Sequence, residues 1–155
     1  MIRASRPSDG PATVEIWRRA VDATHDFLTP EDRVAIDMQV AEFLPRTPLW
    51  LAVDEHDRPI GFMGLSKVRL DSLFIDPDHH RQGIGRALIA LALSLHAVLE
   101  TEVNEQNLGA RAFYARLGFT PYAWTPDDGE GRAYPLIHLR LDPAGRHRAK
   151  AKSGA

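Results

Sequence analysis

The chain has 155 residues, a formal net charge of −2 and no cysteine. Its length suits one domain, and 44% hydrophobic with 26% charged residues is a composition typical of globular proteins. The lack of cysteine excludes disulfides, thiolate metal sites and a cysteine nucleophile. The N-terminal residues lack the pattern of a signal peptide, and the longest apolar stretch, residues 87–99, is too short to span a bilayer. We therefore expect a cytoplasmic protein without a membrane partner.

Charge is distributed unevenly along the chain. Residues 142–155 contain four basic side chains and one acidic one, so the remainder of the chain is acidic. An acidic body disfavours general nucleic-acid binding, which needs a basic face. We predict a single domain over residues 1–141, followed by a basic disordered tail over 142–155, and no specific nucleic-acid partner.

The first half of the chain predicts two helices and four strands. Val14, Trp17, Val21 and Leu28 recur at helical spacing in a helix that begins near Pro11. The segment Thr29-Pro30-Glu31-Asp32 predicts the start of a second helix, because a hydroxyl, a proline and two acids all favour a helix N-terminus. Strands are predicted over residues 1–6, 49–53, 59–65 and 68–75, with a hairpin turn over 54–58.

The second half predicts two more helices and three strands. The first helix has Ile84, Leu88, Leu91, Ala92 and Leu95 on one face. Asn107 opens a short helix, and Gly118 fits its C-terminal cap. Strands are predicted over residues 99–103, 119–124 and 133–141. The order β-α-α-β-β-β-α-β-α-β-β predicts an α/β (α+β) fold, with a central, mixed, mostly antiparallel sheet and helices on both faces.

A glycine-containing turn joins the fourth predicted strand to the third helix. It reads Arg81-Gln82-Gly83-Ile84-Gly85. A helix N-terminus offers free N–H groups and positive dipole charge, and glycines let a phosphate approach the backbone closely. Arg81 and Arg86 add positive charge. The turn by itself fits a phosphate-binding site and a purely structural connection between strand and helix equally well. It is neither a dinucleotide fingerprint nor a P-loop.

A second motif decides between these readings. Residues 103–119 read VNEQNLGARAFYARLGF. Together with Asp76-Pro77 and the glycine turn, this stretch resembles the GCN5-related N-acetyltransferase superfamily, and the resemblance covers residues 2–141. Residues 21–28, VDATHDFL, are similar to the YjaB-type bacterial branch. One position departs from the family pattern: His80 stands where the pyrophosphate loop usually begins with Arg or Gln. We expect weaker or more pH-dependent cofactor binding.

The resemblance implies acetyl-CoA as cosubstrate and no metal. It implies that the fourth and fifth strands splay apart, and that the pantetheine arm bonds to the backbone of Leu73, Phe74 and Ile75. Asn107 would hold the cofactor, and Tyr114 would act as general acid toward the CoA thiolate. A plain core role for Tyr114 is the alternative. The pyrophosphate would meet the backbone amides of Arg81, Gln82, Gly83, Ile84, Gly85 and Arg86.

The acceptor side needs a base, because a cationic amine must lose a proton before it attacks. Asp71 and His25 are the two candidates. Asp71 fits a sheet-surface residue as well, and His25 fits a favourable partner of a helix C-terminus. The remaining histidines lack metal-ligand spacing. The expected acceptor pocket contains Asp22, His25, Asp26 and Phe27. Asp22, Asp26 and Asp71 together indicate a positively charged amine.

We expect an N-acetyltransferase that transfers acetyl directly from acetyl-CoA to a primary amine of a small molecule or of a protein or peptide. The missing cysteine supports direct attack within a ternary complex. The alternative function is a regulatory module that binds acetyl-CoA without turnover. The sequence leaves the oligomeric state open between monomer and homodimer.

Overall fold

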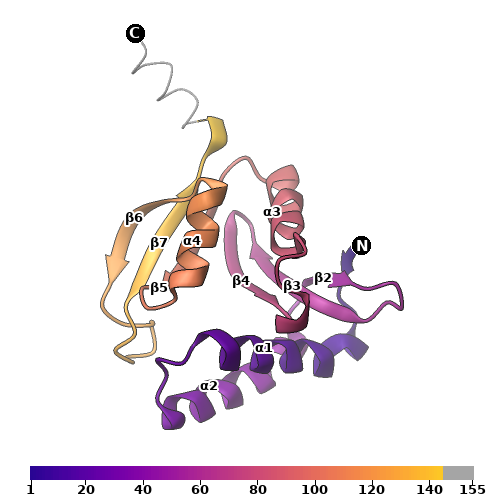
Figure 1. The fold of residues 1–155 in the computed structure, drawn as a ribbon, viewed down its shortest axis with the longest axis horizontal. Helices are drawn as coiled ribbons and strands as arrows, with labels where there is room; N and C mark the ends of the chain where they lie inside the picture. Colours follow the sequence, from indigo (N-terminus) through magenta and orange to yellow (C-terminus); the bar gives the residue numbers. More distant parts are fainter. Residues whose placement is uncertain (145–155) are drawn as a thin grey trace. The chain divides into compact units, whose positions relative to one another are not determined.

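Strands and helices follow one another in the predicted order across residues 1–144, the part of the chain that this computed structural model describes (Figure 1). The strands are β1 (Ile2–Ala4), β2 (Trp50–Val53), β3 (Pro59–Ser66), β4 (Arg69–Ile75), β5 (Leu99–Asn104), β6 (Thr120–Thr125) and β7 (Leu136–Leu141). The helices are α1 (Gly10–Thr24), α2 (Pro30–Phe43), α3 (Ile84–Leu95) and α4 (Leu108–Leu117), with short 3₁₀ helices η1 (Pro7–Asp9), η2 (Leu44–Arg46) and η3 (Pro77–His79).

The sheet has the strand order β1-β2-β3-β4-β5-β7-β6. β1 pairs with β2, β2 with β3, β5 with β7 and β7 with β6, all antiparallel, whereas β4 and β5 are parallel. The predicted mixed, mostly antiparallel sheet is therefore confirmed. None of the helices in residues 1–144 has the length and apolar composition of a membrane span.

The chain divides into two compact units. The first comprises Met1–Leu65 and Asp71–Ile89, and the second comprises Ser66–Leu70 and the residues from Ala90 onward. The single domain over residues 1–141 stays a prediction. Most of the predicted basic tail, residues 145–155, lies outside the described residues.

In the first unit, α1 and α2 cover one face of the strands, and Figure 1 shows the two helices side by side. Apolar residues from α1, β2 and β3 form the core beneath them, and partly buried residues of α2 and β4 pack against it. The buried members are Ile16, Trp17, Val21, Leu49, Leu51, Val53 and Phe62. The helical spacing that predicts α1 is therefore the spacing that buries its residues in this core.

The predicted first helix is too long at its C-terminal end. α1 stops at Thr24, because His25 has non-helical backbone angles (φ −110°, ψ 53°), and Leu28 lies in the loop that follows. The predicted start of the second helix is confirmed. The Thr29 hydroxyl accepts a hydrogen bond from the Asp32 N–H at 3.1 Å, which satisfies one of the free donors of the first turn.

Ion pairs join α1 and α2 on their polar side. Asp37 of α2 accepts hydrogen bonds from Arg18 of α1 and from Arg33, each at 2.8 Å. Arg33 also reaches Asp22 of α1 at 2.8 Å, and its guanidinium lies over the ring of Trp17. The two arginines lower the pKa of Asp37 to about 2, because hydrogen bonds and charge both favour the carboxylate.

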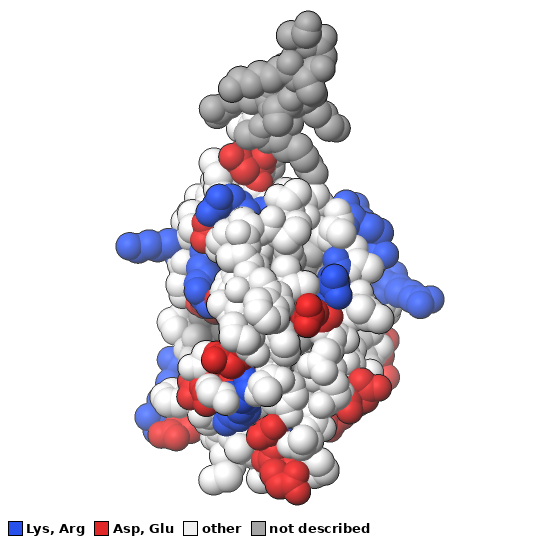
Figure 2. Space-filling model, turned by 90° about the vertical axis from the view of Figure 1, so that its left-hand side faces the viewer, with Lys and Arg blue, Asp and Glu red and all other residues white. Residues whose placement is uncertain are grey.

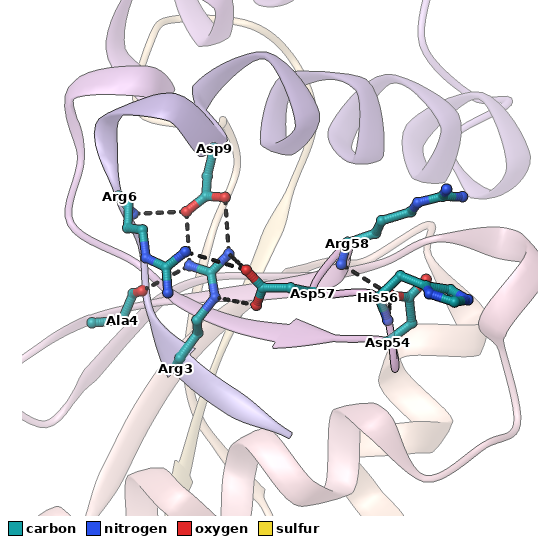
Figure 3. A network of polar contacts seen from close by, with 8 residues as sticks. All are labelled: Arg3, Ala4, Arg6, Asp9, Asp54, His56, Asp57 and Arg58. Atoms are coloured by element: carbon teal, nitrogen blue, oxygen red, sulfur yellow. Dashed lines mark hydrogen bonds and ion pairs between the residues drawn. The ribbon is translucent and has the colours of Figure 1, made fainter.

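A second polar network connects β1 to the β2–β3 hairpin (Figure 3). The Arg3 guanidinium donates to both carboxylate oxygens of Asp9, at 2.9 and 3.0 Å, and to Asp57 at 2.8 Å. Asp57 has a left-handed backbone (φ 63°) in the hairpin turn, where Asp54 accepts hydrogen bonds from two backbone N–H groups. The network holds β1 beside the hairpin turn over residues 54–58, and the structure confirms this predicted turn.

Gly61 of β3 lets α3 begin close to the strands. A Cβ at this position would lie 2.8 Å from Ile75 Cδ1 and 3.2 Å from Ile84 Cγ2, so both isoleucine side chains would have to shift. Further along α3, Leu88, Ile89 and Ala92 are buried, while Leu95 is 50% exposed. The predicted face therefore buries Leu88 and Ala92, whereas Leu95, the last residue of the helix, is exposed.

In the second unit, α4 packs on β5 through Tyr114, and β7 lies between β5 and β6. Gly118 caps α4 with a left-handed backbone (φ 100°), as predicted. β7 begins at Leu136 and not at residue 133, since Arg132 and Tyr134 form a turn. β6 is largely exposed, and Arg140 lies over the ring of Tyr122. On the face that Figure 2 shows, acidic and basic side chains are interspersed.

Candidate active site

The segment after β4 is held by acidic side chains. Asp76 accepts a hydrogen bond from the Asp78 N–H at 2.9 Å and so caps η3. Arg19 of α1 donates to Asp76 at 3.2 Å and to Asp78 at 2.8 Å. The Asp-Pro pair seen in the sequence therefore has a structural role, because it fixes the direction in which the chain leaves the strand.

The glycine turn that follows is exposed and has the backbone of an anion-binding loop. Arg81 and Gly83 have left-handed backbones, with φ of 64° and 78°. Gly83 caps α3, since the Ala87 N–H donates to the Gly83 carbonyl at 3.0 Å, and this leaves the first-turn N–H groups of the helix without intrahelical acceptors. A Cβ on Gly83 would meet nothing within 4 Å, so the space beside it is open.

These features fit a pyrophosphate group. Free N–H groups at a helix N-terminus and the positive end of its dipole attract phosphate oxygens. The side chains of Arg81 and Arg86 are exposed on the same turn and add positive charge. His80 is exposed as well, directly after η3, and Gln82 contacts His79 at 3.3 Å. A phosphate ligand needs none of these side chains in particular, because the backbone supplies the donors.

Successive side chains at the end of β4 point to opposite faces of the sheet. Phe74 packs toward the core under α1 and α2, with its ring 5.6 Å from that of Phe62, whereas Ile75 points toward Ile84 of α3. The ladder between β4 and β5 pairs Arg69 with Glu100 and Leu70 with Thr101. Each strand continues beyond this short ladder, β4 to Ile75 and β5 to Asn104.

Tyr114 is buried in the second unit, among the rings of Phe113 and Phe119 at 5.3 and 5.2 Å. Burial raises the pKa of Tyr114 to about 12, and a hydrogen bond with Thr101 acts in the opposite direction. The phenol therefore stays protonated through the physiological range, as a proton donor must. Asn107 caps α4, with its side-chain oxygen accepting from the Ala110 N–H at 3.1 Å, which leaves its amide N–H₂ for a ligand.

The expected acceptor residues of the first unit lie around the end of α1. Asp22 is exposed and paired with Arg33, so its negative charge is compensated. His25 and Phe27 are half-buried, with ring centroids 5.2 Å apart, and Asp26 is exposed. Burial lowers the pKa of His25 below its usual value, and the Asp26 carboxylate opposes this shift.

The other candidate base, Asp71, lies on β4 with an exposed side chain. It takes part in further polar interactions, so it is not a free carboxylate. The structure places Asp71 and His25 on different elements of the first unit, and exposure by itself does not distinguish them as bases.

Three contacts involve residues that sequence reasoning did not single out. Thr24 lies next to His25, with 2.7 Å between Oγ1 and Nδ1, and Thr101 is hydrogen-bonded to Tyr114. Arg19 holds η3 in place. Threonine and arginine at these positions have no distinctive local pattern, so only the contacts seen in the structure identify them.

Comparison with known proteins places the chain in a family. A family model described as an acetyltransferase (GNAT) domain matches residues 45–121. Peptidyl-lysine N-acetyltransferase YjaB of Salmonella typhimurium is 48% identical over 138 residues, which are 89% of this chain and 95% of the relative. YjaB of Escherichia coli is 49% identical over 138 residues, which cover 89% of this chain and 94% of the relative.

Structural similarity agrees with sequence similarity. The solution structure of apo-form YjaB from Escherichia coli matches this fold with a TM-score of 0.88 at 48% identity, over 90% of this chain and 95% of that one. The chain therefore belongs to the GCN5-related N-acetyltransferase (GNAT) superfamily, in its YjaB-like branch, and is an acetyl-CoA-dependent N-acetyltransferase.

Proposed function

We propose that the chain acetylates the ε-amine of lysine side chains in proteins or peptides. The observation that carries this proposal is the identity of 48% to a peptidyl-lysine N-acetyltransferase, over nearly the whole length of both chains. The similarity includes both the acceptor-side segment and the cofactor-side motifs, because it extends over 89% of this chain. The simplest explanation of this similarity is that both proteins act on the same class of acceptor.

The cofactor roles are assigned residue by residue. The pyrophosphate binds the backbone amides of residues 81–86, a role supported by the open space at Gly83 and by the free donors at the start of α3. The pantetheine arm bonds to the backbone of Leu73, Phe74 and Ile75. Asn107 offers its side-chain amide to the cofactor.

The chemistry is a direct transfer. The deprotonated lysine nitrogen attacks the thioester carbonyl carbon, a C–N bond forms, and a tetrahedral oxyanion results. The C–S bond then breaks, and Tyr114 protonates the departing CoA thiolate. A base takes the first proton of the lysine ammonium before the attack. As the C–S bond breaks, the attacking nitrogen loses a second proton, which restores the Tyr114 phenol. A phenol that is protonated at working pH suits the acid role, because general acid catalysis needs the protonated form.

A lysine acceptor is cationic before it reacts, and acidic side chains favour its approach. Asp22 contributes little to that attraction, because Arg33 neutralises it. Asp71 takes part in further polar interactions as well, so the acidic character rests mainly on Asp26. We also propose that the reaction takes place in the cytoplasm and that the enzyme works as a monomer or homodimer.

The test combines cofactor titration with peptide acetylation. Wild type and Gly83→Asp are titrated with acetyl-CoA, and acetylation of a lysine-containing peptide is followed by mass spectrometry. We expect Gly83→Asp to lose acetyl-CoA binding by at least about tenfold, because a carboxylate enters the phosphate position at a backbone that disfavours side chains. Peptide acetylation falls with it.

Gly129→Asp is the matched control. Gly129 also has a left-handed backbone (φ 86°) and open space around it, but it lies in the β6–β7 loop. The control shares the backbone strain without the phosphate position, so it should bind acetyl-CoA like the wild type. Equal loss in both variants would contradict the pyrophosphate assignment. Acetyl-CoA binding without acetylation of any amine would instead support the regulatory module.

A further inference from the structure

The end of α1 contains a short chain of hydrogen bonds. The hydroxyl of Thr24 lies 2.7 Å from the carbonyl oxygen of Ala20, one helical turn earlier. The same Oγ1 lies 2.7 Å from Nδ1 of His25. The O···O distance is typical of a hydrogen bond and the N···O distance is at the short end of the usual range, so both contacts are hydrogen bonds.

The protons in this chain can be assigned from chemistry. The Ala20 carbonyl has no hydrogen, so the single hydroxyl hydrogen of Thr24 must lie on the line to that carbonyl. Oγ1 therefore accepts from His25, and Nδ1 is the nitrogen that carries the ring proton. If Thr24 donated to Nδ1 instead, two oxygen atoms would face one another at 2.7 Å without a proton between them. In the neutral ring, Nε2 thus keeps its lone pair.

The surroundings of the ring favour its neutral form. The imidazole is half-buried against Phe27. Its pKa lies below the usual histidine value because burial disfavours the cation, and Asp26 is the charged neighbour that acts the other way. On the helices packed here, Asp22 of α1 is bound to Arg33 of α2. Within residues 1–144, Nε2 has no hydrogen-bond partner.

We propose that His25 is the base of the acetyl transfer, accepting the acceptor's ammonium proton at Nε2, and that Thr24 is a positioning residue that holds the other ring proton on Nδ1. The proton leaves the amine nitrogen and forms an Nε2–H bond, so the ring becomes an imidazolium whose Nδ1–H still donates to Thr24. This inference rests on the proposed function, because it needs a cationic amine. It selects His25 over Asp71.

The tautomer is measurable without any turnover. Two-bond ¹H–¹⁵N correlation spectra of protein labelled with ¹⁵N-histidine distinguish a protonated Nδ1 from a protonated Nε2, and His25→Gln assigns the signals. We expect the Nδ1–H form in the wild type and in Thr24→Ser, which keeps the hydroxyl. Thr24→Val removes the acceptor and should lose that preference. An Nε2–H ring in the wild type would overturn the role of Thr24.

Kinetics test the base itself. For a lysine peptide, we expect His25→Gln to lower kcat/KM by about 100-fold or more. Its pH profile should lose the inflection of His25 and follow only the ionisation of the lysine itself. Thr24→Val should lower kcat/KM by a smaller factor, and Thr24→Ser should restore it. The exposed His56→Gln is the control and should match the wild type.

A second acceptor separates a base from a structural residue. An aminooxy peptide carries an amine that is already neutral at assay pH, so it needs no deprotonation before attack. His25→Gln should acetylate it nearly as fast as the wild type does. Equal loss with both acceptors, or no loss with either, would overturn the base assignment. A wild type that acetylates no amine would refute the proposed function and the base together, while the tautomer measurement would still decide the Thr24 contact.

Discussion

Tyr114 shows how a single residue acquires a chemical property from its surroundings. Its helical spacing with Phe113 is equally compatible with a plain core residue. Burial among aromatic rings raises the pKa of the phenol to about 12, so the group holds its proton at any pH at which the fold is expected to work. An exposed tyrosine is also protonated near neutral pH, so burial does not enlarge the protonated fraction and makes the phenol a weaker acid.

We predict that Tyr114→Phe lowers kcat by about 10²- to 10⁴-fold, the usual contribution of a general acid. The Kd for acetyl-CoA should change little, because the variant removes one hydroxyl and leaves the ring. Steady-state kinetics and a separate cofactor titration measure the two effects. Because the pKa of Tyr114 is about 12, its ionisation should not lower the kcat of the wild type below about pH 11.

Tyr122→Phe serves as the control for this substitution. Tyr122 is exposed on β6, and its hydroxyl contacts Glu100 at 3.4 Å, so the variant also loses one surface hydroxyl. Its kcat should equal that of the wild type. If Tyr114→Phe were as active as Tyr122→Phe, the proton on the thiolate would have to come from water.

At the scale of elements, the pairing of α1 with α2 depends on both apolar and polar contacts. α2 has no buried residue, although Ile36 and Val40 pack against the core partly covered. Such a helix needs additional attachment, and the ion pairs Arg18–Asp37 and Arg33–Asp22, which join α1 to α2, supply it. These contacts also determine where the loop with His25 and Phe27 lies, because that loop joins the two helices.

We predict that Asp37→Asn destabilises the fold by about 1–2 kcal/mol at pH 7, since two charge-assisted hydrogen bonds weaken at a partly exposed site. The lowered pKa of Asp37 means that its contribution is fully present above about pH 4 and is lost as the pH falls toward about 2. Chemical denaturation at pH 7 and pH 2.5 should therefore show a difference between variant and wild type that shrinks in acid.

Glu42→Gln is the matched control on the same helix. Glu42 is exposed, and the substitution also neutralises one acidic side chain of α2. Its stability should stay close to that of the wild type at both pH values. A loss equal to that of Asp37→Asn would mean that net charge, and not the pairing of α1 with α2, explains the effect.

At the scale of the whole molecule, several groups have pKa values shifted in the same direction. Arg3 lowers the pKa of Asp9 and Asp57, Arg18 and Arg33 lower that of Asp37, and Arg19 lowers that of Asp78. Burial lowers the pKa of His25. Each of these groups binds a proton more tightly in the unfolded chain, so each makes stability rise with pH.

We predict that the free energy of unfolding falls in two stages on acidification. The first stage begins near pH 6.5, the unfolded pKa of histidine, and comes from His25. The second begins near pH 4 and comes from the paired carboxylates. Urea denaturation measured from pH 3 to 8 follows both stages. His25→Gln should lack the first stage and keep the second; a first stage that persists in this variant would assign it to another histidine.

The sequence by itself determined the order of the elements, the cap at Thr29, the left-handed cap at Gly118 and the location of the glycine turn, because each depends on local backbone geometry and on the spacing of apolar residues. It could not determine that Leu28 lies outside α1, that Leu95 is exposed or that β7 begins at Leu136, since these depend on where helices and strands meet other elements.

Only the tertiary structure decided the proton positions and charges of the candidate site. The pairing of Asp22 with Arg33, the burial of Tyr114 and the contact of Thr24 with both Ala20 and His25 set which groups are neutral, charged or proton-bearing. The protonation state of a side chain depends on its burial and on its partners. Some of these partners are far apart in the sequence, and others come into contact only because a helix ends there. Residue types and spacing therefore indicate the cofactor, whereas the acid–base chemistry requires the fold.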